Sequence, residues 1–192
     1  MSALSKFSSD LATACSTPST WAQSGNDIGT AIDTFMQAVQ INTIVNGAIT
    51  SPSVPPVVTP VVNAPGTLNN LVVAGTAALV SACAAAYASA TWALIGTQIG
   101  NAILAYIPTV TVNTKVLTAS AGVGNLIPVA AGLPVQLSLL YGNPSLTWQV
   151  LGQQMASAIS TAFAASTLAT VDAGAEPGGA FVGTGVGTLS WS

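Results

Sequence analysis

The chain has 192 residues, of which 51% are hydrophobic and only 4% are charged, and it contains no histidine. Its two lysines, Lys6 and Lys115, cannot form a nucleic-acid-binding surface or a basic patch for an anionic membrane. The lack of histidine excludes histidine general-base catalysis. Such a poorly charged surface protects a monomer weakly against association, so we expect it to be covered by partners or by copies of the chain.

A pattern that begins with Thr-Trp and continues with small residues and Ala-Ile occurs three times. The copies are Thr20, Trp21, Gly25, Gly29, Ala31, Ile32; Thr91, Trp92, Gly96, Gly100, Ala102, Ile103; and Thr147, Trp148, Gly152, Ala156, Ala158, Ile159. Self-similarity of this kind is the signature of a repeated supersecondary unit. We therefore interpret a set of eight residues as structural anchors rather than parts of a reaction centre: Trp21, Trp92, Trp148, Gly25, Gly29, Gly96, Gly100 and Gly152.

The first helix–strand unit is expected within residues 1–50. Apolar residues from Trp21 onward recur at spacings of four and three, which places them on one helical stripe, with Asp27 and Asp33 on the polar face. Thr17-Pro18 is the expected start of this helix. The β-branched run 42–45 predicts a strand after it.

Residues 51–66 hold five prolines, which predicts an extended arm or linker with polyproline character. Residues 67–135 form the second unit. It opens with an Ala-rich, helix-prone segment (67–90), from which the second Trp-led helix could continue. Pro108 is expected to end that helix, and residues 112–116 are predicted to form a strand.

The third unit is expected in residues 136–192. Its helix is predicted to start at Asn143-Pro144, and residues 168–171 and 183–191 read as β-like, the latter as a short edge strand or hairpin. Asp172 and Glu176 lie among glycines, which favours a solvated loop over a metal or acid/base site. The expected fold is therefore α+β: three copies of an amphipathic helix followed by a short strand, with Gly/Pro-rich extended arms.

Cys15 and Cys83 are the only cysteines, and each ends a Leu-x-x-Ala-Cys string. Free cysteine behaves as a small buried hydrophobe, which fits these Ala-rich surroundings. A disulfide between the two stays open at this stage. No residue pattern predicts a catalytic, cofactor-binding or metal site, and no cofactor is expected.

The tryptophans and glycines each have a second interpretation. Three aligned tryptophans could form a stacking platform for sugars or bases, but at the head of an apolar stripe we expect core anchors. The Gly25/Gly29 and Gly96/Gly100 pairs have the small-x-x-x-small spacing of closely packed helices, as in membranes. Polar residues flank both pairs, so we expect this packing in a soluble core.

A membrane role is the alternative function class. No charged residue lies between Asp33 and Lys115, so the helices of 71–107 could serve a membrane-associated or pore-forming protein. The stretch 71–90 is mostly Ala, Ser, Thr and Gly, which insert weakly into bilayers, so we favour a non-membrane role.

Residues Ala158-Ile159, Thr167 to Val171 and Gly183 to Thr188 resemble small virion structural proteins of tailed bacteriophages, which have a helix, a Thr/Val strand and a Gly-Thr-Gly tail. The resemblance implies a non-enzymatic structural subunit of the tail, baseplate, neck or head surface. It implies localisation in the virion after assembly in the host cytoplasm. The implied partners are other virion proteins and copies of the chain, with no nucleic acid and no small-molecule ligand.

Overall fold

The structure is a computed structural model that describes residues 2–17, 20–66, 70–89, 91–117, 120–129 and 131–191. These residues form an α+β fold of six α-helices, a short 3₁₀ helix and one seven-stranded sheet. The helices are α1 (Ala3–Ser16), α2 (Trp21–Gln37), α3 (Thr76–Ser89), α4 (Trp92–Tyr106), α5 (Leu133–Tyr141) and α6 (Trp148–Ala165), and η1 covers Ile107–Thr109. The strands are β1 (Gln40–Thr50), β2 (Val58–Pro65), β3 (Asn70–Val73), β4 (Val110–Thr114), β5 (Ala121–Ile127), β6 (Thr167–Glu176) and β7 (Gly179–Ser190).

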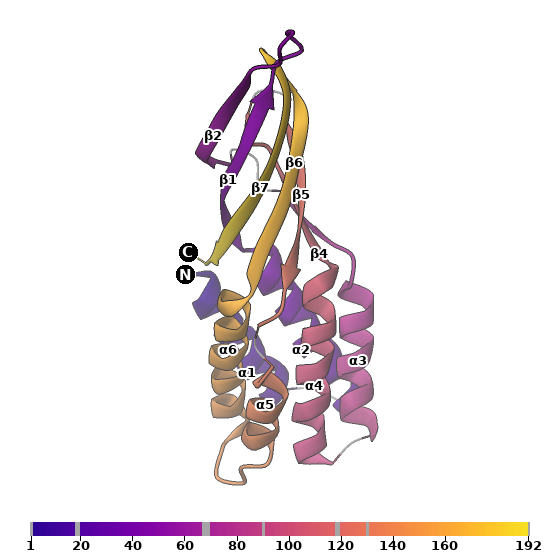
Figure 1. Cartoon of the computed structure of the whole chain (residues 1–192). Coiled ribbons are helices and arrows are strands. Elements are labelled where there is room, and N and C mark those ends of the chain that lie inside the picture. Colours follow the sequence, from indigo (N-terminus) through magenta and orange to yellow (C-terminus); the bar gives the residue numbers. More distant parts are fainter. Residues whose placement is uncertain are drawn as a thin grey trace.

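The molecule is elongated, with the helices bundled at one end and the strands projecting from the other (Figure 1). Both ends of the chain lie where the bundle meets the sheet. The starts of α4 and α6 and the connection between α5 and α6 lie at the far end of the bundle. We call this far end the tip.

The six helices pack in a closed ring that follows the sequence. Each helix contacts the next one along the chain, and α6 contacts α1. The apolar stripes of the three Trp-led helices face the inside: Ile28, Ile32, Ile99, Ile103, Met155 and Ile159 are all fully buried. Burial of these side chains is the main favourable contribution to the bundle.

Glycine allows three of the helix contacts to be very close. A Cβ atom at Gly25, Gly96 or Gly152 would lie less than 3 Å from backbone atoms of the adjacent helix, which are those of α3, α5 and α1 respectively. The same holds for Gly29 and Gly100. Each Trp-led helix thus meets a neighbouring helix almost backbone to backbone.

The strands form one antiparallel sheet in the order β2-β1-β7-β6-β5-β4-β3. β2 and β3 are its opposite edges, yet only residues 66–69 separate them along the chain. Five residue steps reach at most about 18 Å, whereas seven flat strands would put the edges ~29 Å apart. The sheet therefore curls, and the chain itself links its two edges.

The curled sheet encloses a narrow interior. Val45, Val116 and Phe181 pack together inside it. Glycines on β5 and β7 leave room for the side chains opposite: a Cβ at Gly185 would collide with Thr170 and Val45, and one at Gly187 with Leu168. Alternating burial along β5, β6 and β7 follows the two-residue period of strands, with one face inside and one face outside.

Several expectations about element boundaries were wrong. The first and third Trp-led helices are capped by Thr20 and Thr147, not by Thr17 or Asn143, because these threonines have extended backbones and accept hydrogen bonds from the first helical turn. Pro18 lies outside the described residues. In the Ala-rich segment 67–90, residues 70–73 form a strand, and α3 is separate from α4 rather than continuous with it.

The proline-rich segment 51–66 is not simply an arm. Its second half is β2, which pairs with β1 along one side only, so that Pro60 is tolerated on an edge strand. Conversely, β7 is not an edge strand, since it lies between β1 and β6. It does form the expected hairpin with β6.

The alternative function class, a membrane-associated or pore-forming protein, was tested for helices that could span a bilayer. In the part of the chain that the structure describes, none of the helices combines the length and the hydropathy needed to cross a bilayer.

Candidate functional site

The three tryptophans that begin α2, α4 and α6 meet at the tip. Ring centroids of Trp21 and Trp92 are 5.1 Å apart, those of Trp92 and Trp148 are 5.1 Å apart, and those of Trp21 and Trp148 are 6.3 Å apart. We call these residues the tryptophan cluster. The indoles are not buried core anchors: Trp21, Trp92 and Trp148 are 53%, 42% and 41% exposed. The fold thus brings three residues that are 71 and 56 positions apart in the sequence into one aromatic cluster.

Helix capping explains why the indoles lie at the tip. Each tryptophan is the first helical residue and follows a threonine with an extended backbone. Thr20 accepts a hydrogen bond from the Gln23 amide at 3.1 Å, and Thr147 accepts one from the Val150 amide at 3.3 Å. Each helix begins at this point, so the tryptophan is the first residue of the apolar stripe and lies beside solvent.

Two pockets flank Trp92. The first pocket, of about 360 Å³, is lined by Trp21, Tyr87, Thr91, Trp92 and Ile95. The second pocket, of about 400 Å³, is lined by Trp92, Leu140, Tyr141, Gly142, Asn143, Pro144, Leu146, Trp148 and Leu151. Their walls correspond: each has two indoles, one tyrosine at the end of a neighbouring helix, and the residue three positions after the tryptophan (Ile95 or Leu151).

Buried hydroxyls and thiols lie behind the pockets. The Tyr87 and Tyr141 hydroxyls are 2.6 Å apart and hydrogen-bonded. Burial raises the pKa of both tyrosines above the usual value. Cys15 and Cys83 are free and buried, and burial raises the pKa of each thiol to about 12. All four groups are therefore neutral at physiological pH, and neither thiol is activated as a nucleophile.

The tyrosines were not recognised from the sequence as part of this site. Tyr87 lies five residues before its tryptophan and Tyr141 seven residues before its own, because the intervening turns differ in length. A search for fixed offsets from the tryptophan could not find them. The contacts of the glycines relate the two tyrosines instead. Tyr87 and Tyr141 each lie four residues after the residue that faces a glycine of the adjacent helix (Cys83 facing Gly25, and Leu137 facing Gly96), and Cys15 lies four residues after Leu11, which faces Gly152.

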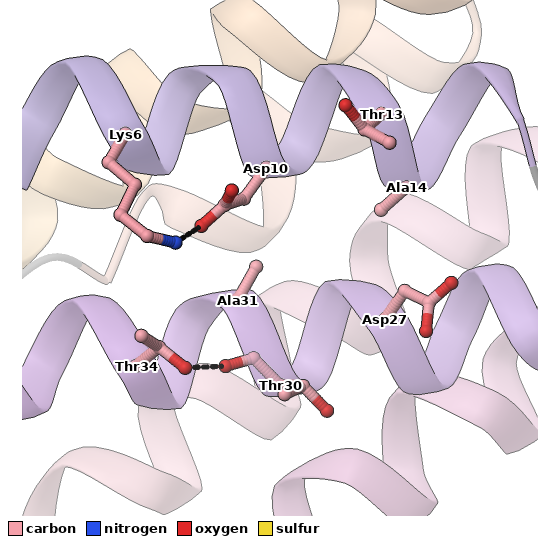
Figure 2. Close-up of a pocket in the computed structure, with 8 residues that line it drawn as sticks. All are labelled: Lys6, Asp10, Thr13, Ala14, Asp27, Thr30, Ala31 and Thr34. Atoms are coloured by element: carbon pink, nitrogen blue, oxygen red, sulfur yellow. Dashed lines mark hydrogen bonds and ion pairs between the residues drawn. The ribbon is translucent and has the colours of Figure 1, made fainter.

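Charged side chains gather in a different place. A groove of about 320 Å³ between α1 and α2 is lined by Lys6, Asp10, Thr13, Ala14, Asp27, Thr30, Ala31 and Thr34 (Figure 2). Lys6 and Asp10 form an ion pair at 2.5 Å, and Asp27 accepts a hydrogen bond from Gln23 at 2.6 Å. The ion pair joins residues one turn apart on an exposed surface, where such pairs contribute only about 0.3–0.5 kcal/mol. The charged groups of the groove are therefore accounted for by interactions between residues one turn apart on the same helix, and they give no sign of a ligand site.

Three carboxylates, those of Asp33, Asp172 and Glu176, are buried, contrary to expectation. Asp33, expected on a polar face, is only 5% exposed and accepts hydrogen bonds from Tyr106 at 2.7 Å, Thr76 at 2.7 Å and Gln37 at 2.6 Å. It thereby joins α2 to the start of α3 and the end of α4. A buried carboxylate is tolerated because its acceptor sites are filled by donors.

Asp172 and Glu176 are also not in a loop. Both lie on β6, and both side chains are buried, because the residues alternate with outward-facing ones along the strand. Asp172 accepts hydrogen bonds from Thr114 at 2.5 Å and Thr170 at 2.8 Å inside the curled sheet. Among the described residues, His, Cys, Asp and Glu side chains form no group of three or more that could hold a metal ion.

No protein-family model matches the chain, and comparisons with curated proteins and with solved structures gave no significant match.

Proposed function

We propose that the chain consists of three αα-ββ units that form a pseudo-threefold assembly within one polypeptide. The units are α1-α2-β1-β2, α3-α4-β4-β5 and α5-α6-β6-β7, with β3 as a continuation of the first unit. Equivalent offsets from the tryptophan support this proposal. The residues 11 positions after it are Ile32, Ile103 and Ile159, and those 22 positions after it are Thr43, Thr114 and Thr170; all six are buried.

The contacts between units support the same symmetry. The glycine four positions after the tryptophan faces the backbone of Cys83 in the first unit, Leu137 in the second and Leu11 in the third. These three positions are therefore equivalent, and so are the residues one turn further on, namely Cys15, Tyr87 and Tyr141. The two Leu-x-x-Ala-Cys strings are out of phase under this alignment, because Cys15 corresponds to Tyr87 rather than to Cys83.

On this architecture we propose that the protein is a non-enzymatic structural subunit of a bacteriophage virion, in the tail, baseplate, neck or head surface. One observation carries the assembly role: the outward face of the sheet is uncharged and carries many exposed apolar side chains. Exposed β-branched residues occur on six of its strands, namely Ile44, Val58, Val62, Val72, Val123, Ile127, Val171, Val182 and Val186. None of the exposed residues described on the strands is charged.

Exposed apolar side chains on a strand surface are normally accompanied by protecting charges or covered by partners. The register places Val123 beside Val171, and Val186 beside both Ile44 and Ala169, so these side chains are neighbours across the strands. Partners that cover such a surface fit a particle in which every subunit has fixed neighbours. The resemblance to virion structural proteins supports a virion as that particle, with other virion proteins and copies of the chain as the partners.

Quantitative mass spectrometry of purified phage particles tests this proposal. Particles made by a genome that encodes the chain should contain it at a fixed ratio to the major capsid protein, and the ratio should survive density-gradient and size-exclusion steps. Recovery with the host membranes at a variable ratio, or absence from intact particles, would contradict the virion role.

A further inference from the structure

We propose that two copies of the chain associate head to head through the tip, with the tryptophan cluster at the centre of the interface. The inference names one surface of the assembly role proposed above, but it depends only on the geometry of the tip.

The first argument is the exposure of the indoles. Tryptophan is the residue type most enriched among residues that dominate binding energy, and those residues lie near the centre of interfaces. Trp21, Trp92 and Trp148 form a contiguous group whose side chains are 41–53% exposed, although the stripes that they head are otherwise buried. The tip thus carries the apolar centre of an interface, and no element among the described residues covers it.

The second argument is charge. In a twofold-symmetric contact the same patch meets itself, so any charge on the patch is brought near its like. The described residues that line the two pockets include no charged side chain. The nearest acid along α2, Asp27, is six residues beyond Trp21, about 9 Å up the helix, and it is hydrogen-bonded to Gln23. A charge-free patch can meet itself without electrostatic cost.

The third argument is area. Six helices of about 10–12 Å diameter present ends that cover roughly 500–700 Å². A stable interface buries about 600–1,000 Å² on each partner. The whole tip is therefore just large enough for a stable pair, provided that its centre is well packed.

The fourth argument is shape. The first and second pockets, of about 360 and 400 Å³, lie beside projecting indoles and are related to one another by the same set of wall residues. A surface with both projections and recesses at regular positions can interlock with a rotated copy of itself. Polar groups of the turns around the cluster, such as Asn143 and Thr91, supply a hydrogen-bonding rim.

Sedimentation velocity over a wide range of protein concentrations tests the proposal. The wild-type chain should show a monomer–dimer equilibrium. Trp92→Ser removes the indole shared by both pockets and should weaken the dimer at least tenfold. Leu4→Ser is the matched control, because Leu4 is 44% exposed at the start of α1, at the opposite end of the bundle from the tip and outside the sheet, and this variant should dimerise like the wild type.

A second variant guards against misfolding of Trp92→Ser. Ser145 is exposed in the turn before α6, so Ser145→Glu should fold normally, as judged by circular dichroism, and should weaken the dimer by placing an acid in the interface. A monomeric wild type at all concentrations would overturn the inference. A dimer that both tip variants leave intact would also overturn it. So would a monomer whose tryptophan fluorescence shifts to shorter wavelength only when phosphatidylcholine vesicles are added, because the indoles would then bind lipid and not a second copy.

These outcomes are distinct from those of the virion test. A monomer present in particles at a fixed ratio would overturn head-to-head pairing and leave the virion role standing. A tip-dependent dimer that is absent from particles would do the reverse.

Discussion

At the scale of single residues, the close helix contacts depend on glycines, which have no side chain to separate the two backbones. Gly96 sits where α4 meets α5, and its Cα faces the Leu137 carbonyl group. Gly25 and Gly152 play the corresponding part against α3 and α1. In an ordinary helix, glycine is destabilising by about 1 kcal/mol relative to alanine. Here the gain from the close approach of two backbones must outweigh that penalty.

Gly96→Ala should therefore lower the free energy of unfolding by about 1–3 kcal/mol, as overpacking does, in spite of alanine's higher helix propensity. The added Cβ would collide with backbone atoms, which cannot rotate away. Gly132→Ala is the control, because no atom lies within 4 Å of the added Cβ there, and it should change stability little. Urea unfolding of the three proteins decides. Equal stabilities for the two variants would show that the α4–α5 contact is loose.

The buried carboxylate on α2 gives a second test at this scale. Asp33→Asn should destabilise the fold by roughly 1–3 kcal/mol, because the donors of Tyr106, Thr76 and Gln37 all point at its two oxygens and one oxygen would become an NH₂ group. Asp27→Asn, on the same helix, is the control: Asp27 accepts a hydrogen bond from the surface residue Gln23, so we expect a change within about 0.5 kcal/mol. Thermal melts of both variants against the wild type measure the difference. A loss for Asp27→Asn as large as that for Asp33→Asn would contradict this account.

At the scale of elements, all three Trp-led helices begin directly after a threonine, with or without a side-chain cap. Thr20 and Thr147 accept hydrogen bonds from amides of the first turn, whereas the Thr91 side chain makes no such bond at the start of α4. The helix start nevertheless lies at Thr-Trp in all three Trp-led helices. The side-chain cap therefore adds stability to two of these helices, and packing of the stripe fixes the start of all three.

Thr20→Ala should cost about 0.5–2 kcal/mol of unfolding free energy, which is typical of a lost N-cap. Thr91→Ala removes the same atoms from a threonine without a cap bond and should cost clearly less. Chemical denaturation of the pair, followed by circular dichroism, gives the comparison. Similar losses would mean that the Thr20 hydrogen bond at 3.1 Å contributes nothing of its own.

Elements with strong periodicity could be predicted from the sequence, and others could not. The Trp-led helices and the strands that follow them were recognised because β-branched and apolar residues recur at fixed offsets. The sequence did not single out α1, α5 or β5. Small residues (Ser, Ala and Gly) are frequent in α1 and β5, and the burial of these two elements depends on distant partners. Gly122 on β5, for example, faces Asp172 and Thr114. The buried position of Asp172 follows from strand alternation, which a glycine-rich sequence conceals.

The candidate site was predictable only in its centre. Fixed offsets singled out Trp21, Trp92 and Trp148, but spacing alone could not show that the three helices start at the same end of one ring. The exposure of the indoles was also not predictable, because an amphipathic stripe indicates which side of a helix is buried and not how far the neighbouring helices extend. Turns of unequal length hid Tyr87 and Tyr141.

At the scale of the whole molecule, the ring of helices buries a set of groups that ionise only at high pH. Cys15, Cys83, Tyr87 and Tyr141 lie inside the bundle near the tip, and Tyr106 is bonded to Asp33 near the sheet. Burial raises the pKa of each of these five groups above its usual value. The fold therefore holds their protons more tightly than the unfolded chain does.

This linkage predicts a loss of stability in alkali. Each thiol has a pKa near 9.0 when unfolded and about 12 when folded, so its contribution is complete below pH 9 and is lost as the pH rises toward 12. Each group that ionises only on unfolding lowers the free energy of unfolding by about 1.4 kcal/mol per pH unit. Two thiols give about 2.7 kcal/mol per unit above pH 9, and the tyrosines steepen the fall from about pH 10.

Urea unfolding from pH 7 to 11.5 measures this slope, and the Cys15→Ala/Cys83→Ala double variant isolates the thiols. The double variant should be less stable at pH 7, because it leaves small cavities. Between pH 9 and 10 its stability should fall only about a third as steeply as that of the wild type, because in this range the three tyrosines have only begun to ionise in the unfolded chain. Above pH 10 both proteins should lose stability as the tyrosines ionise in the unfolded chain. A wild-type stability that stays constant to pH 11, or an equal slope at pH 9–10 without the thiols, would contradict the burial of these groups in a closed ring of six helices.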